Sequence, residues 1–119
     1  RVSFLPADVM QPPPIMTGSF DLVVSNPPYI PTVDIFTLDP SVRDYEPVWA
    51  LDGGEDGLDF YRAILKGWKQ VLRQGGQLMF EVGEEQAGAV KDLMLMSGFY
   101  DAAVVPDTRG VERVVTAKL

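Results

Sequence analysis

The protein has 119 residues, the length of one modest domain, and a formal net charge of −7 at pH 7. It contains no cysteine and no histidine, which excludes disulfides, thiol nucleophiles, imidazole catalysis and the usual zinc sites. The acidic balance disfavours binding to phosphate backbones, and no apolar run approaches the roughly 20 residues of a membrane-spanning helix. We therefore expect a cytoplasmic globular domain with no metal site and no membrane partner.

The first part of the chain contains two predicted strands with a proline-rich connection between them. Val2–Leu5 is an apolar, strand-like run, and the prolines of Gln11–Pro14 prevent helix or sheet from continuing. Phe20–Ser25 is rich in β-branched and apolar residues, which is typical of a strand at the centre of a parallel sheet. This second strand stops at the tetrapeptide Asn26-Pro27-Pro28-Tyr29.

The region from Ile30 to Gly57 is predicted to be a long functional loop with short ordered pieces. Prolines interrupt it, yet it carries many large apolar side chains, which a disordered linker would lack. Its acidic, glycine-rich end, Asp52–Gly57, resembles a calcium-binding loop. That interpretation fails because Ala63 stands where the bidentate glutamate of such a loop belongs.

The second half of the chain alternates helices and strands. The predicted elements are a helix over Leu58–Leu72 stopped by Gly75–Gly76, a strand over Gln77–Val82, a helix opening at Glu84–Glu85 and ending at Gly98, and strands over Phe99–Val105 and Glu112–Leu119. This order predicts an α/β, doubly wound fold whose mostly parallel sheet ends in an antiparallel hairpin at its edge.

The tetrapeptide Asn26–Tyr29 is the strongest candidate for a chemical site. Ligands bind at the carboxyl ends of parallel strands, where this segment is placed. Each proline fixes φ and removes an N–H, so the loop presents rigid carbonyl acceptors, and Asn26 adds a side-chain carbonyl. Two such acceptors can orient the hydrogens of a planar NH₂ group, and Tyr29 can stack on it. The alternative is a strand end with ordinary turn residues.

Phe20–Tyr29 resembles the catalytic motif of S-adenosylmethionine-dependent methyltransferases that act on amino groups of adenine, guanine or glutamine. Further segments resemble the release-factor glutamine methyltransferases (the HemK/PrmC family). These segments are Pro40–Pro47, Ala50–Arg62, Glu81–Gly83 with Gln86, and Asp107 with Gly110 and Arg113. The resemblance implies methylation of N5 of the glutamine in the Gly-Gly-Gln segment of class I peptide chain release factors.

The same resemblance implies that residues 1–119 are the C-terminal part of the catalytic domain. The family's Rossmann-like sheet has the order 3-2-1-4-5-7-6, and this chain would supply strands 3 to 7. The N-terminal strands that bind the cofactor would be missing, as would the glycine-rich turn after the first of them. A helical domain that binds the release factor would also lie outside this chain. The chain alone is then expected to be inactive.

By position, the resemblance implies roles for five residues. Asn26, Pro27, Pro28 and Tyr29 would form the catalytic and substrate-amide site. Asn26 would also contact S-adenosylmethionine, and Asp8 would lie close to its adenine. An exposed aspartate after a strand is more often only a cap or turn residue.

Two rival functions stay open at this point. One is a DNA or RNA amino-methyltransferase that uses the same tetrapeptide, although the charge of −7 argues against a nucleic-acid partner. The other is a catalytically silent module. The expected partners are class I release factors and the missing N-terminal half of the enzyme.

Overall fold

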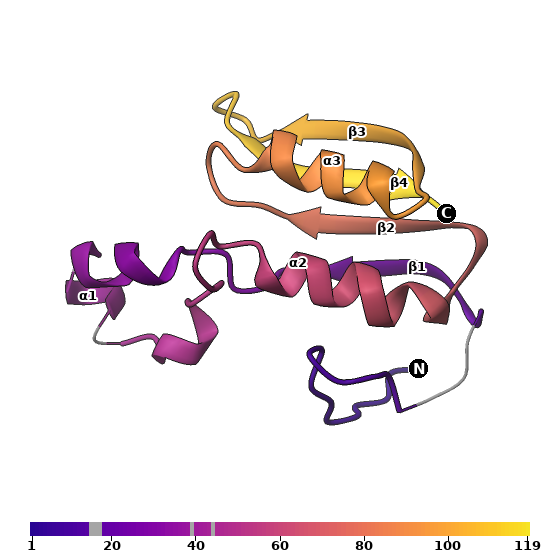
Figure 1. The fold of residues 1–119 in the computed structure, drawn as a ribbon, viewed down its shortest axis with the longest axis horizontal. Coiled ribbons are helices and arrows are strands. Elements are labelled where there is room, and N and C mark those ends of the chain that lie inside the picture. Colours follow the sequence, from indigo (N-terminus) through magenta and orange to yellow (C-terminus); the bar gives the residue numbers. More distant parts are fainter. Residues whose placement is uncertain (15–17, 39, 44) are drawn as a thin grey trace.

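The computed structural model describes residues 1–14, 18–38, 40–43 and 45–119. One layer of helices packs on one face of a four-stranded sheet (Figure 1). The strands are β1 (Phe20–Ser25), β2 (Leu72–Glu81), β3 (Tyr100–Pro106) and β4 (Glu112–Lys118). The helical layer consists of α2 (Asp59–Ala63), which continues as η3 (Ile64–Trp68) and η4 (Lys69–Val71), and of α3 (Ala87–Met96). Within the described ranges, none of the helices has the length and apolar character needed to cross a membrane.

The strand order is β1-β2-β4-β3. β1 runs parallel to β2, while β4 is antiparallel to both of its neighbours, β2 and β3. Three strands therefore share one direction and β4 alone opposes them. This confirms the α/β class, the C-terminal hairpin and the partial order 4-5-7-6 that the resemblance implies.

The core lies between the sheet and its helices. Along β2 the buried side chains alternate, with Leu78 and Phe80 facing the helices. The ring of Tyr61 in α2 meets Phe80 edge to face, with centroids 5.0 Å apart. Val90 from α3 and Val115 from β4 belong to the same cluster and are fully buried. Each such side chain contributes about 1.5–3 kcal/mol through burial.

One prediction for the N-terminal third is confirmed and one needs correction. Phe20–Ser25 forms a strand with the predicted bounds. It lies at the edge of the described sheet, so Leu22 and Val24 are 50% and 66% exposed. Val2–Leu5 is not a strand, and Phe4 is 93% exposed. An extended segment becomes a strand only by pairing its backbone groups with a neighbour, and no described segment pairs with Val2–Leu5.

The predicted stop at Gly75–Gly76 is wrong because these glycines lie inside β2. The helical layer already ends before Leu72, the first residue of that strand. Pairing with β1 passes from Leu72 directly to Gln77, so β2 carries extra residues that bulge out of the ladder. Gly75 has φ of 80°, which a bulge accommodates and which a residue other than glycine rarely adopts.

The start of α3 also differs from the prediction. Glu84 and Glu85 form a turn before the helix, and α3 begins at Ala87. Glu85 has φ of 71°, which is incompatible with a helical first turn. The predicted end is confirmed, since Gly98 follows the helix with φ of 92°.

The predicted long loop between β1 and α2 is confirmed as a loop with short ordered pieces. They are η1 (Thr32–Thr37), α1 (Pro40–Arg43) and η2 (Val48–Ala50). Asp44, part of the family-like segment Pro40–Pro47, lies outside the described residues. This loop leaves the carboxyl end of β1, and its last part returns there, where the Ile30 amide donates to the Leu51 carbonyl.

Candidate active site

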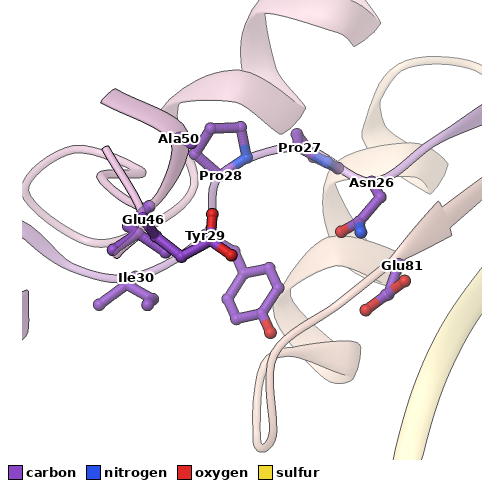
Figure 2. Close-up of a pocket in the computed structure, with 9 residues that line it drawn as sticks. Asn26, Pro27, Pro28, Tyr29, Ile30, Glu46, Ala50 and Glu81 are labelled. Atoms are coloured by element: carbon purple, nitrogen blue, oxygen red, sulfur yellow. The ribbon is translucent and has the colours of Figure 1, made fainter. Parts of the chain in front are cut away.

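A pocket of about 210 Å³ opens at the carboxyl ends of β1 and β2 (Figure 2). Asn26 directly follows β1, and Glu81 is the last residue of β2. Ser25 pairs with Phe80 in the parallel ladder, so Asn26 and Glu81 come next to each other at the same edge. The pocket is lined by Asn26, Pro27, Pro28, Tyr29, Ile30, Glu46, Ala50, Leu51 and Glu81. The structure therefore brings all four predicted tetrapeptide residues into one cavity.

The polar groups of this pocket are mainly hydrogen-bond acceptors. Asn26 contributes a side-chain carbonyl, and Glu46 and Glu81 contribute carboxylates. No lysine or arginine stands among the described residues that line it. Such a set suits an NH₂ group or a cation and is unsuited to a phosphate.

Three glycines leave room for the Asn26–Tyr29 loop, two of them for its backbone and one for the Tyr29 ring. A Cβ on Gly53 would lie 2.7 Å from Tyr29 Cα and 2.9 Å from the Pro28 carbonyl oxygen. A Cβ on Gly57 would collide with the Tyr29 carbonyl, and one on Gly83 would lie 2.7 Å from the Tyr29 ring. Larger residues at positions 53 and 57 would thus press against the backbone of the loop, and one at position 83 would press against the Tyr29 ring.

Hydrogen bonds tie the start of the long loop to its end. The Ile30 amide donates to the Leu51 carbonyl at 3.1 Å, and the Gly53 amide donates back to the Ile30 carbonyl at 2.8 Å. Asp52 Oδ1 accepts from Thr32 Oγ1 at 2.7 Å and from the Gly54 amide. The Thr32 hydroxyl and the Gly54 amide hold the pKa of the Asp52 carboxyl below its ordinary value.

Asp56 connects the same loop to α2. Its carboxylate pairs with the Arg62 guanidinium and also accepts from the Leu58 amide at 3.0 Å. The bond from Arg62 is the main cause that lowers the pKa of Asp56 to about 2. The acidic, glycine-rich segment Asp52–Gly57 therefore fastens the pocket loop, which gives it a role other than cation binding.

Tyr61, in α2, holds the last residue of β2 in place through a hydrogen bond. Its hydroxyl donates to the Glu81 carbonyl oxygen at 2.7 Å. Burial, with a smaller effect from Tyr29 and Glu81, raises the pKa of the Tyr61 phenol well above its ordinary value. The phenol therefore stays protonated and keeps this bond throughout the physiological pH range.

Asp8 is not among the residues of this pocket. Its Oδ1 accepts from the Met10 amide at 2.9 Å, which makes it the first residue of a local turn. The adjacent Val9 lines a separate pocket of about 180 Å³ that also contains Ser25, the residue before Asn26. The N-terminal segment thus passes near the end of β1, and the cofactor role of Asp8 stays a prediction.

Sequence reasoning missed Glu81 as a pocket residue and gave no role to Gly53 or Gly57. Glu81 could have been predicted, because it is an ionisable residue at the end of the next parallel strand, and such a residue lies at the same edge of the sheet. The two glycines could not have been predicted from the sequence, since their role depends on closure of the loop onto Tyr29.

Comparisons with known proteins give consistent matches, although no protein-family model matches the chain. A release factor glutamine methyltransferase from Geobacter sulfurreducens is 49% identical over 106 residues, which is 89% of this chain and 37% of that relative. One from Clostridium acetobutylicum is 43% identical over 117 residues, or 98% of this chain and 41% of the relative. The chain thus spans about two-fifths of the length of these curated relatives.

One solved structure is similar in both sequence and fold. It is the release factor-specific protein-(glutamine-N5) methyltransferase of Alicyclobacillus acidocaldarius, at 31% identity and a TM-score of 0.51. The match covers 83% of this chain and 48% of that one. It supports the assignment of the sheet to the class I methyltransferase fold, of which this chain forms a part.

Proposed function

Because the chain belongs to the release factor glutamine methyltransferase family, we propose that an enzyme containing it methylates release factors. The methyl group would go to the side-chain amide of the glutamine in a Gly-Gly-Gln segment. The observation that carries this proposal is the acceptor-lined pocket in which Asn26, Pro27, Pro28 and Tyr29 come together. An enzyme of this kind would act in the cytoplasm, where translation takes place.

The proposed chemistry begins with orientation of the substrate amide. An amide nitrogen is a poor nucleophile because its lone pair is delocalised into the carbonyl group. The Asn26 side-chain oxygen and the Pro27 carbonyl accept its two N–H groups and favour a more tetrahedral nitrogen, which frees the lone pair. Tyr29 stacks on the flat amide. Acceptors that act chiefly in the transition state lower the barrier rather than tighten ground-state binding.

A proton must leave once the nitrogen carries the new methyl group. The nitrogen is then cationic and its proton is acidic, so no strong base is needed before transfer. Glu46 and Glu81 are the carboxylates of the pocket and can accept that proton. They also make the pocket favourable for positive charge.

We propose S-adenosylmethionine as the methyl donor, and the pocket residues fit its cationic end. When bound, the donor would supply an electrophilic methyl group: the bond from the methyl carbon to the sulfonium sulfur breaks as the new bond to nitrogen forms, and the sulfur keeps the electron pair as a neutral thioether. Asn26 would contact it close to the methyl group, with the carboxylate of Glu81 beside Asn26. Asp8 would contact its adenine from the N-terminal segment.

The substrate protein would extend beyond the pocket. Val48 and Trp49 are exposed beside Ala50, which lines the cavity. Exposed apolar side chains next to a site offer a surface for the body of a release factor. We therefore expect intact release factor to be a better substrate than a short peptide, because remote contacts improve orientation.

A tritiated-donor assay with the full-length enzyme tests the proposal. We expect methylation of release factor carrying Gly-Gly-Gln and none when this glutamine is replaced by glutamate, which offers no amide hydrogens. DNA and RNA serve as competing substrates in the same assay. Preferential methylation of either nucleic acid would replace the proposal with an amino-methyltransferase of nucleic acids.

A further inference from the structure

Gln86 joins the pocket loop to the turn that follows β2. Its Nε2 donates to the Tyr29 carbonyl oxygen at 2.8 Å, and its Oε1 accepts from the Gly83 amide at 3.0 Å. The two ends of one side-chain amide thus bond to two segments that are far apart in the sequence. The side chain is half-buried between them.

The position of Gln86 in the helix does not explain these bonds. It occupies the N-cap of α3, yet its side chain makes no capping hydrogen bond to that helix. Serine, threonine, aspartate and asparagine are the residues that favour this position. The side chain instead turns away from α3, toward Gly83 and Tyr29.

The Tyr29 carbonyl is a point from which the whole tetrapeptide can be fixed. Pro27 and Pro28 have no backbone N–H, so neither can anchor itself by donating a hydrogen bond. Rigid φ angles in both prolines transmit the position of Tyr29 back toward Asn26. Gln86 supplies a side-chain donor to this carbonyl.

We propose that Gln86 is a positioning residue that holds Tyr29 and, through the two prolines, sets the acceptor atoms of Asn26 and Pro27. It acts through the loop without touching the substrate amide. This inference rests on the proposed methyltransferase function. The glycines only leave room for the loop, whereas Gln86 holds the loop through a hydrogen bond from its side chain.

The test compares three variants of the full-length enzyme. Gln86→Met keeps the length of the side chain and removes both hydrogen bonds. Gln86→Glu keeps an acceptor for the Gly83 amide but turns an acceptor toward the Tyr29 carbonyl, so it removes the loop contact selectively. The matched control is Gln77→Met, which removes a similar bond of a half-buried glutamine, from Nε2 to Thr116 Oγ1 at 2.7 Å, outside the pocket.

We expect kcat on release factor to fall about tenfold to a hundredfold in both Gln86 variants, with the KM for the donor changed by less than about threefold. The Ile30 amide, which follows Tyr29, should exchange its hydrogen faster in both. Gln77→Met should change neither quantity. A purely structural role would lower the melting temperature of both Met variants and leave kcat unchanged, which would overturn the inference.

Hydrogen exchange separates this inference from the proposed function. If the wild-type enzyme fails to methylate release factor, the proposed function is wrong. Faster exchange at Ile30 in both Gln86 variants then still supports the anchoring of the loop. Unchanged exchange at this amide overturns the anchoring, whatever the activity.

Discussion

Replacing Gly53 by alanine in the full-length enzyme would place a methyl group against the backbone of the pocket loop. The new Cβ would lie 2.7 Å from Tyr29 Cα, whereas non-bonded carbon atoms approach to about 3.5–4.0 Å. Its other near neighbours, the carbonyl oxygens of Gly57 and Pro28, are also backbone atoms, so no side chain can move aside. The loop itself must therefore shift by roughly 1 Å.

A shift of this size acts on the rate more than on the fold. Displacing reacting groups by about 1 Å costs on the order of 10²-fold, so we expect kcat for release-factor methylation to fall about a hundredfold. Overpacking should lower the free energy of unfolding by about 1–3 kcal/mol. Steady-state kinetics with the tritiated donor and thermal denaturation measure the two effects.

Gly88→Ala provides the matched control for Gly53→Ala. Gly88 lies in α3, and a Cβ there would meet nothing within 4 Å. We expect this variant to be more stable by about 0.5–1 kcal/mol, because alanine favours helix, with kcat unchanged. A folded Gly53→Ala enzyme whose kcat stays within about threefold of wild type would refute the claim that the pocket loop needs glycine at position 53.

Three further predictions concern the pocket, the ion pair between Asp56 and Arg62, and the isolated chain. Asn26→Ala should lower kcat by about 10²–10³-fold in the same assay, with little change in melting temperature, because under the proposed function the lost acceptor would act mainly in the transition state. The lowered pKa of Asp56, about 2 against an ordinary 3.8, means that its ion pair with Arg62 stabilises the fold above about pH 4 and is lost as pH falls through about 2. Asp56→Asn should therefore lower the free energy of unfolding by less than about 1 kcal/mol at pH 7, since both side chains of the pair are half exposed. In denaturant unfolding, the difference in this free energy between wild type and variant should shrink between pH 4 and pH 2. The 119-residue chain alone should not bind S-adenosylmethionine at micromolar concentration, and it should self-associate through the exposed edge of β1. Calorimetry measures the binding and light scattering the association, and a monomeric chain that binds the donor would contradict this prediction.

The tetrapeptide could be located from the sequence because the pattern of one strand fixes where its carboxyl end lies. Phe20–Ser25 predicts the strand, and Asn26–Tyr29 must then follow it at the ligand-binding edge. The residues that hold this loop could not be found in the same way. Gly53 and Gln86 reach Tyr29 only after the long loop has closed and β2 has paired with β1.

The errors in the fold have a common physical origin. Val2–Leu5 has the local composition of a strand, but strand formation depends on a partner that local composition does not reveal. Gly75–Gly76 has the composition of a helix stop, yet the same freedom at positive φ serves a bulge within β2. In both segments the pairing of strands, which local composition does not reveal, decided the outcome.

The position of β4 between β2 and β3 affects how the chain folds during synthesis. A ribosome delivers these strands in sequence order, but β3 reaches the sheet only through β4, the last of them. Until Glu112–Lys118 has emerged, β2 and β3 both keep unpaired edges, which favour association with other nascent chains. A product cut short by a premature stop codon before Glu112 would therefore lack the strand that joins its sheet, and we expect proteases and chaperones to remove it.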